Sequence, residues 1–285
     1  MKTGLTIGKF APLHKGHQYL IEKALEEVDH LIIIVYDAPK LTQIPVDVRA
    51  NWIRTIYPQT TVIEGWHVPQ VEGWSEENQQ KHEQFVLGLI MGAKIDVFFS
   101  SEHYGERMSK TLNCENRVID MDRNNISISA TEIRINAYQY RHFLNPLVYD
   151  DFVTKVVILG DNEALKRNLI IDLAHHYHTV HVEGDAESLK TLIQSAYQAN
   201  RFLFINDHHF KHYVSDIAHD ELSRSNLEKV IHTTHQRYDL ILILEEENMQ
   251  KYISLCQQLH RAYHLIRIDK KDQVLDIIES YSKYT

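Results

Sequence analysis

Short apolar runs rich in β-branched residues alternate with longer amphipathic segments along nearly the whole chain. The apolar runs predict strands, and the amphipathic segments predict helices. In the first half we expect strands over Leu5–Phe10, Leu31–Tyr36, Thr61–Glu64, Asp96–Ser100 and Arg117–Asp120, and helices over His17–Glu27, Val46–Tyr57, Glu76–Met91 and Tyr104–Leu112. Continuous apolar strands such as Leu31–Val35 are typical of a parallel sheet covered on both faces. The pattern therefore predicts an α/β fold with a Rossmann-like, doubly wound parallel sheet.

The same alternation restarts after Asn145-Pro146-Leu147, and no low-complexity linker separates the halves. Here we expect strands over Lys155–Leu159, Thr179–Val182, Phe202–Ile205, Leu240–Leu244 and His264–Ile268, and a last helix over Lys271–Tyr284. Two such runs predict two α/β domains, the first over residues 1–150 and the second over residues 151–285.

The amino-acid composition limits the class of protein and the kinds of molecule that it can bind. At 285 residues, with 44% hydrophobic and 24% charged residues, the chain has the make-up of a folded soluble protein. Its net charge of -9 argues against binding to nucleic acid or to an anionic membrane, because such binding needs a basic surface. The two cysteines form no CxxC pair, no apolar run approaches the roughly 18 residues of a membrane span, and the N-terminus lacks a signal-peptide core. We therefore expect a cytoplasmic protein in which a local site holds any bound phosphate.

Nineteen histidines raise the question of a metal site. The clusters His175-His176-Tyr177-His178 and Asp207-His208-His209 do not match a zinc-ligand spacing with partners nearby. We expect these clusters to be structural or solvent-facing, and we expect no metal site built from protein side chains.

A candidate phosphate-binding loop joins the first strand to the first helix: Gly8-Lys9-Phe10-Ala11-Pro12-Leu13-His14-Lys15-Gly16-His17, here called the histidine loop. Loops at the carboxyl ends of parallel strands form the ligand sites of α/β proteins. Gly8 permits close approach of the backbone to a ligand. Gly16 lets the chain enter the helix, so that His14 and His17 can point into the same space. Two imidazoles beside the N–H groups of a helix N-terminus predict a phosphate site.

A second candidate lies late in the first domain, at Ile128-Ser129-Ala130-Thr131-Glu132-Ile133-Arg134. Ser129 is a good helix N-cap, and Glu132, three residues on, completes a capping box. Arg134 follows in the same short helix. This helix N-terminus and its arginine can meet a polyphosphate from the side opposite the histidines.

Both segments resemble signatures of the adenylyltransferase superfamily, GxFxPxHxGH in the histidine loop and ISxTxxR in the second segment. In that superfamily a substrate phosphate attacks the α-phosphorus of ATP directly, so the protein supplies positioning and charge stabilisation. The resemblance implies that His14 and His17 stabilise the oxygens around the α-phosphorus, with Mg²⁺ on the phosphates. The other residues that it implies for catalysis and ATP binding are Lys9 or Lys15 as helpers, Ser129, Thr131 and Arg134 on the β- and γ-phosphates, and Gly8, Phe10, Gly16 and Ile128.

The chain resembles more closely the NadR family of bifunctional NMN adenylyltransferase/ribosylnicotinamide kinases, where NMN is nicotinamide mononucleotide. The supporting stretches are Ile44–Arg49 through Trp52, Glu72-Gly73-Trp74, Ser100-Ser101-Glu102, Asn125–Ser129 and the crossover Tyr138–Val153. This resemblance implies that the first domain converts NMN and ATP to NAD and pyrophosphate. It also implies that the second domain has a P-loop-kinase-like fold.

Three residues are candidates for the NMN end of the site. Trp74 offers a flat aromatic face to the positively charged nicotinamide ring, or else packs beside its loop. Arg49 meets a phosphate or pairs with a neighbouring acid. Asp37, after the second strand, orients a ribose or Lys40.

The second domain opens with Gly160-Asp161-Asn162-Glu163-Ala164-Leu165-Lys166-Arg167, where the family has a phosphate-binding loop of the form GxxxxGK[ST]. Leu165 replaces the second glycine and resists the backbone angles that such a loop needs. Arg167 replaces the hydroxyl that binds Mg²⁺, and of the metal-organising acids after Phe202 only Asp207 is present. We expect a domain that keeps its fold and has lost the kinase chemistry.

Two other functions compete with this interpretation. One is adenylyl or cytidylyl transfer to another phosphate acceptor, although head-group cytidylyltransferases typically carry Asp where this chain has Ala11. The other is a nucleotide-sensing regulator that binds NMN, NAD or ATP and acts through the kinase-like domain. A homo-oligomer is an open alternative to a monomer.

Overall fold

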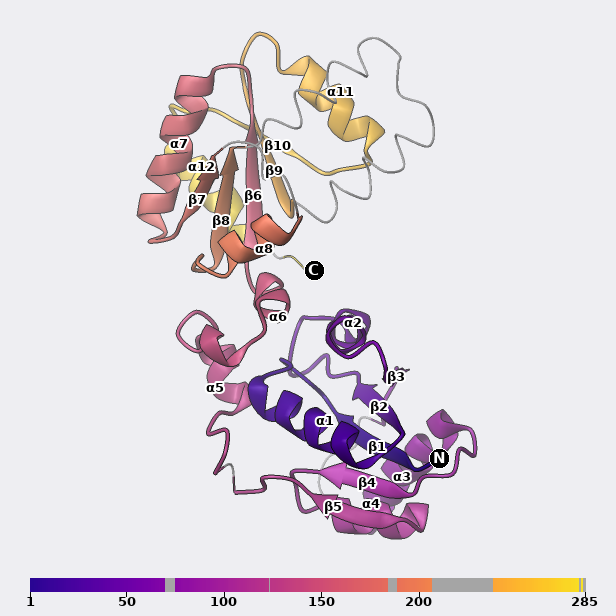
Figure 1. Cartoon of the computed structure of the whole chain (residues 1–285). Helices are drawn as coiled ribbons and strands as arrows, with labels where there is room; N and C mark the ends of the chain where they lie inside the picture. Colours follow the sequence, from indigo (N-terminus) through magenta and orange to yellow (C-terminus); the bar gives the residue numbers. More distant parts are fainter. Residues whose placement is uncertain (70–74, 123, 184–188, 207–237, 282, 284–285) are drawn as a thin grey trace. The chain divides into compact units, whose positions relative to one another are not determined.

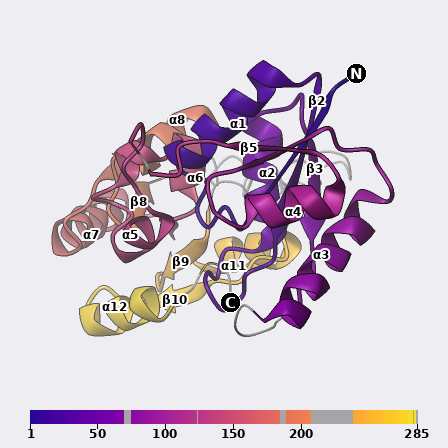
Figure 2. The same ribbon diagram turned by 90° about the horizontal axis from the view of Figure 1, so that it is seen from below.

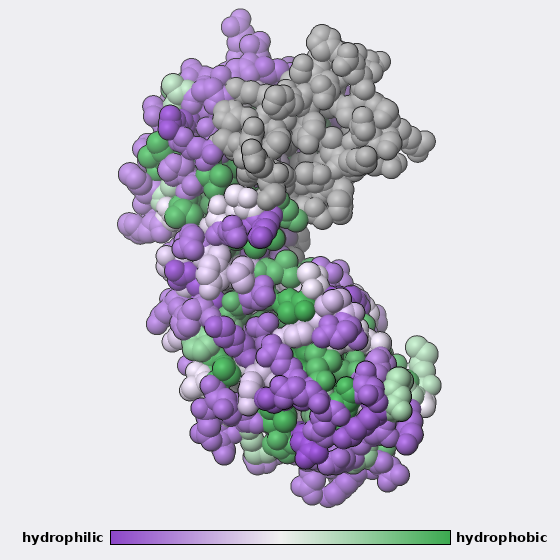
Figure 3. Space-filling view, viewed as in Figure 1, coloured by the Kyte–Doolittle hydropathy of each residue, from purple (hydrophilic) through white to green (hydrophobic). Residues whose placement is uncertain are grey.

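The computed structural model describes residues 1–69, 75–122, 124–183, 189–206, 238–281 and 283 (Figure 1). The described chain forms two compact units, one over Met1–Val148 and one over Tyr149–Lys283. In the described ranges no helix is long and apolar enough to span a membrane. On the face drawn in Figure 3, hydrophilic residues cover most of the described surface of each unit.

Unit 1 is built on a five-stranded sheet whose order is β3-β2-β1-β4-β5, and its neighbouring strands all run parallel. Its elements are β1 Thr3–Gly8, α1 Lys15–Glu27, β2 His30–Tyr36, α2 Val46–Ile56, β3 Thr61–Gly65, α3 Glu76–Ile90, β4 Val97–Ser100, α4 Gly105–Leu112, β5 Glu115–Val118, α5 Ala130–Ile135 and η1 Arg141–Phe143. Helix α6, Pro146–Asp150, contains the boundary between the two units. The chain builds outward from β1 to β3 and then crosses to β4 on the other side of β1. The carboxyl ends of β1 and β4 are therefore the switch point at which such sheets bind ligands.

One core cluster of unit 1 lies between the sheet and the pair α3 and α4. Apolar side chains at every second position of the strands meet those of the two helices, as the two-residue period of a strand requires. The buried members are Leu5, Ile7, Ile32, Ile34, Val86, Ile90, Ile95, Phe98 and Met108. Figures 1 and 2 show α3 and α4 side by side. The N-terminal halves of both helices, which carry Asn78 and Arg107, reach the edge of the sheet where β1 and β4 end.

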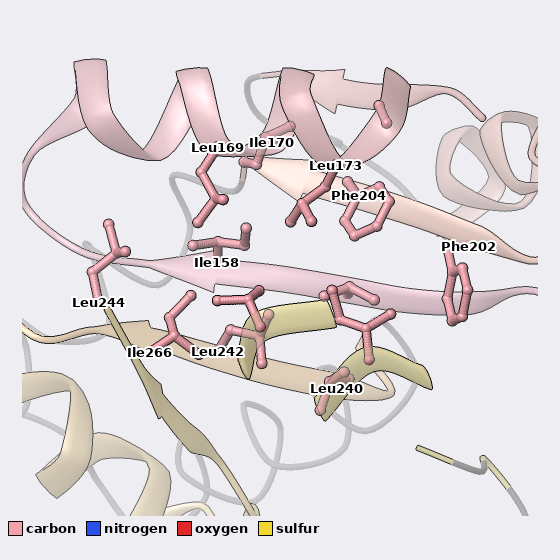
Figure 4. Close-up of a cluster of buried hydrophobic side chains, with 14 residues drawn as sticks. Ile158, Leu169, Ile170, Leu173, Phe202, Phe204, Leu240, Leu242, Leu244 and Ile266 are labelled. Atoms are coloured by element: carbon pink, nitrogen blue, oxygen red, sulfur yellow. The ribbon is translucent and has the colours of Figure 1, made fainter. Parts of the chain in front are cut away.

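Unit 2 contains a second parallel five-stranded sheet, in the order β10-β9-β6-β8-β7. Its described elements are β6 Thr154–Leu159, α7 Glu163–His176, β7 His181–Glu183, α8 Leu189–Ala196, β8 Phe202–Asn206, β9 Leu240–Leu244, α11 Gln250–Gln258, β10 His264–Ile266 and α12 Lys271–Ser280. One core cluster joins α7 and α12 to the same face of this sheet. Figure 4 shows Leu169 and Leu173 pointing from α7 toward β6.

The predicted fold class is confirmed, and the differences lie at element ends. The first strand ends at Gly8 rather than Phe10, because Phe10 has a φ of 45° and leaves the extended region. The first helix begins at Lys15, two residues before the predicted start, because His14 caps it. The last helix ends at Ser280 rather than Tyr284, since Tyr281 is extended.

Candidate active site

A cavity of about 800 Å³ opens at the carboxyl ends of the central strands of unit 1. The histidine loop, the segments that follow β2 and β4, the facing ends of α3 and α4, and α5 form its walls. Its polar and aromatic lining residues are Thr6, Lys9, Phe10, His14, His17, Tyr36, Asp37, Lys40, Asn78, Gln79, His82, Glu83, Ser100, Ser101, Glu102, Tyr104, Arg107, Ser129, Thr131 and Arg134. The cavity thus occupies the switch point of the sheet, where a ligand site is expected.

The two histidines of the loop face each other across one helical turn. His14 caps α1, and its Nδ1 accepts a hydrogen bond from the Gly16 N–H at 3.1 Å. Because Nδ1 is an acceptor, a neutral His14 ring carries its proton on Nε2 and can donate it. The His14 and His17 rings are stacked, and Phe10 packs edge-on against His17 with 5.0 Å between ring centroids. Both imidazoles are therefore oriented before any ligand enters.

Gly16 is required by the position of the His14 ring. A Cβ atom at this residue would lie 3.0 Å from both Cε1 and Nδ1 of His14, which is closer than side chains normally pack. The absence of a side chain at Gly16 therefore lets the imidazole fold back over the start of α1.

Helix α5 brings the second motif to the same wall. Ser129 and Glu132 form the predicted capping box, with both reciprocal bonds present. Arg134 Nη1 donates to the Ala11 carbonyl at 2.6 Å, and Nη2 donates to Thr131 Oγ1 at 2.9 Å. Burial lowers the pKa of Arg134, but the guanidinium stays charged at neutral pH. This arginine ties two motifs that lie 123 residues apart into one site.

Arg49 lies behind the cavity and not on its wall. Its side chain is fully buried, and it donates to the carbonyls of Ile44 at 3.0 Å, of Tyr36 at 2.8 Å and of Lys9. Its Nη2 is 3.9 Å from Asp37, which does line the cavity. Burial lowers the pKa of Arg49, and the nearby acid Asp37 opposes that effect. Arg49 therefore joins the end of β2 to the histidine loop.

The far wall carries residues that no sequence motif indicated. Burial, together with the positive charge of Lys9, lowers the pKa of His82 on α3. Arg107 of α4 donates to Glu83 and, through both Nη atoms, to Glu76 at 2.6 and 2.7 Å. The Tyr104 hydroxyl donates to the Ile7 carbonyl at 2.9 Å. Only the order of the strands and helices brings these side chains to the histidine loop, so no local pattern could have identified them.

The cavity collects most of the predicted site residues, but not all of them. Gly8, Lys9, Phe10, His14, His17, Asp37, Ser129, Thr131 and Arg134 line it. Lys15 is exposed at the start of α1, Ile128 is buried beside Ser129, and neither belongs to the lining; nor do Gly16 and Arg49. Trp74 lies outside the described residues.

The described part of the chain offers no cluster of metal ligands. Within the described ranges, His, Cys, Asp and Glu side chains form no group of three or more that could bind a metal ion. Asp37, Glu83 and Glu102 line the cavity as separate acids, and Glu83 is paired with Arg107.

In unit 2, the two basic side chains of the loop that follows β6 form bonds with acids of the same unit. Lys166 is 1% exposed and donates to Glu163 at 3.2 Å. Arg167 pairs with Glu183 through Nε at 2.7 Å and Nη2 at 2.6 Å. Asp207, the expected metal-organising acid, lies outside the described residues.

Unit 1 is similar in sequence to known nucleotidyltransferases. Residues 5–136 match the cytidylyltransferase-like family. The trifunctional NAD biosynthesis/regulator protein NadR of Escherichia coli strain K12 is 29% identical over 197 residues, covering 62% of this chain and 47% of that protein. A phosphopantetheine adenylyltransferase of Fusobacterium nucleatum subsp. nucleatum is 45% identical over 58 residues, covering 20% of this chain and 36% of that protein. The chain spans about half the length of the NadR relative that it matches.

A solved structure of a NadR protein in complex with NAD and AMP-PNP has the same fold over both units. It matches with a TM-score of 0.52 and 18% sequence identity, covering 99% of this chain and 93% of that one. The fold agreement extends to unit 2. Unit 1 therefore matches the cytidylyltransferase-like family model over residues 5–136, the chain is similar to NadR proteins in sequence over 62% of its length, and it shares their two-unit fold.

Proposed function

We propose that unit 1 transfers the AMP part of ATP to NMN, giving NAD and pyrophosphate. The observation that carries this proposal is the convergence of two distant motifs on one cavity, where Arg134 binds the Ala11 carbonyl beside the stacked His14 and His17. The choice of NMN is supported by the similarity to a protein named for NAD biosynthesis.

The reaction is a direct displacement at phosphorus. An oxygen of the NMN phosphate forms a bond to the α-phosphorus of ATP, the bond from that phosphorus to the β-phosphate oxygen breaks, and pyrophosphate leaves. His14 and His17 supply donors where negative charge gathers on the α-phosphate oxygens. Ser129, Thr131 and Arg134 hold the departing pyrophosphate. No side chain needs to act as a nucleophile.

The end of β2 forms the acceptor side of the site. Asp37 lines the cavity there and orients the ribose of NMN. Stacking of Trp74 on the nicotinamide ring stays a prediction from the sequence. Arg49 is fully buried, so we assign it to positioning Asp37 and the Lys9 carbonyl and not to direct phosphate binding.

Mg²⁺ accompanies the triphosphate. When bound it neutralises charge on the phosphate oxygens. Ser129, Thr131 and Arg134 would hold the phosphates that carry the cation, and Lys9 adds a second positive charge to the cavity wall.

A panel of phosphate acceptors incubated with ATP and Mg²⁺ tests this function. Pyrophosphate release and NAD formation are expected with NMN. Release with phosphopantetheine or a flavin phosphate, but not with NMN, would keep the chemistry and overturn the substrate. Binding of NMN and ATP without release of pyrophosphate from any acceptor would instead favour a nucleotide-sensing regulator.

We further propose that unit 2 does not phosphorylate ribosylnicotinamide. Lys166 is buried against Glu163, and Arg167, which stands where a metal-binding hydroxyl is needed, is paired with Glu183. Incubation with ribosylnicotinamide and ATP should yield no NMN. Formation of NMN that persists in a His17→Ala variant would show that the altered loop still works.

A further inference from the structure

The loop after β6 presents its main-chain amides to a carboxylate of the same chain. Glu246 follows β9, 85 residues from Asp161. The Asp161 N–H donates to its Oε1, and the Asn162 N–H donates to its Oε2 at 3.3 Å. Two adjacent amides thus bind the two oxygens of one anion, which is how loops of this kind hold a phosphate group.

Gly160, the first glycine of the loop, makes room for this carboxylate. A Cβ atom at Gly160 would lie 3.0 Å from Glu246 Oε1, closer than carbon and oxygen normally pack. Two later amides are also engaged: the Leu165 N–H donates to Asn162 Oδ1 at 3.1 Å, and the Lys166 N–H donates to the Asn162 carbonyl at 3.0 Å. The space that Gly160 would leave for a phosphate is thus taken by the Glu246 carboxylate.

The side chain of Asp161 fastens the same loop to α11. Its carboxylate accepts from Lys251 Nζ at 2.6 Å and from the Tyr252 hydroxyl at 2.7 Å. The loop is therefore bonded to the β9–α11 segment through its backbone amides and through a side chain. Three acids, Asp161, Glu163 and Glu246, surround the position where a phosphate would lie.

We propose that Glu246 is an internal ligand that occupies the anion position of this loop and excludes inorganic phosphate and nucleotide phosphates from it. The carboxylate also locks the β6–α7 loop onto the segment that leads into α11. This proposal gives the proposed absence of kinase activity a physical cause, but it does not depend on the reaction of unit 1.

The test uses full-length protein and amide hydrogen exchange. In Glu246→Ala, exchange at the Asp161 and Asn162 amides should accelerate by about tenfold or more, the change expected for losing a hydrogen bond to a charged acceptor. Inorganic phosphate, compared with chloride at equal ionic strength, should restore the protection of these amides in the variant and have no effect on them in the parent protein. Glu247→Ala, which removes an exposed acid one residue away, is the matched control and should behave like the parent.

Three outcomes would overturn the proposal: unchanged exchange at both amides in Glu246→Ala, phosphate protection of equal size in the parent protein, or lost protection that phosphate does not restore. Glu246→Gln covers the case in which the alanine variant fails to fold. It keeps one carbonyl acceptor and should lose part of the protection; full protection in this variant would show that the charge of Glu246 is irrelevant. The readout is confined to unit 2, so failure here is distinct from failure of NMN adenylylation.

Discussion

The imidazole rings of His14 and His17 are stacked, with 3.8 Å between their centroids and 22° between their planes. The Gly16 amide holds the first ring, and the edge of Phe10 holds the second. Donors that are oriented before the reaction need no reorganisation as charge develops on a phosphate. The pair is therefore the part of the site whose geometry most directly predicts catalysis.

Replacing His17 with Ala should lower kcat by about two to three orders of magnitude, the usual scale for removing one preoriented donor. Folding should change little, because His17 is only partly buried on the first turn of α1. Pyrophosphate release and circular dichroism check the two statements. His175→Ala, at an exposed histidine of α7, is the control and should keep full activity. A near-normal rate in His17→Ala would show that the histidine loop has a structural role and that His17 is not catalytic.

Gly16→Ala should lower kcat by about tenfold or more, because a shift of a catalytic group by as little as about 1 Å strongly lowers the reaction rate. The added Cβ would lie 3.0 Å from the His14 ring, which must move. Gly88→Ala on α3 is the matched control, since a Cβ there meets no atom within 4 Å. That variant should keep its activity and gain about 0.5–1 kcal/mol of stability in urea denaturation. Equal activity of both variants would contradict the assigned role of the His14 position.

Arg134→Lys should raise the KM for ATP and lower kcat, with a combined loss of about tenfold or more, the scale of a lost charge-assisted hydrogen bond. Lysine keeps the positive charge but cannot bind the Ala11 carbonyl and Thr131 with a planar fork. Arg134→Ala should lose more activity than Arg134→Lys in the same steady-state assay. If the two variants were equally active, the charge and fork of Arg134 would have no part in turnover.

Acidification should weaken unit 2 through Asp161. Burial opposes ionisation of this carboxyl, but bonds from Lys251 and Tyr252 outweigh it and bring its pKa below the ordinary value of 3.8. Because the folded pKa is the lower one, the stabilisation is complete above the unfolded pKa and is lost as the pH falls through the folded pKa. Urea denaturation at several pH values below 4, followed by NMR signals of unit 2 methyl groups, measures this loss.

In Asp161→Asn the free energy of unfolding of unit 2 should be lower near neutral pH and should depend less on pH below about 4, since the titrating group is gone. Asp172→Asn, at an exposed acid of α7, controls for the general effect of removing a negative charge. A pH dependence identical in the parent protein and in Asp161→Asn would remove Asp161 from this account.

Much of the site could be predicted because it depends on residues near one another in sequence. The capping box of Ser129 and Glu132 spans three residues, and the bond from Gly16 to His14 spans two. Arg49 shows the limit of such prediction. The sequence indicates a positive side chain after the second strand, but the choice between phosphate and protein partners depends on where the Lys9 and Tyr36 carbonyls lie.

The sequence by itself determined the two α/β units and the two candidate phosphate-binding motifs, because the periodicity of apolar residues and short-range hydrogen bonds are local properties. Only the tertiary structure decided that His82 and Arg107 face the histidine loop and that Glu246 fills the loop after β6. These contacts join residues many tens of positions apart. Their geometry follows from strand order and from the packing of helices against each sheet, which no local pattern encodes.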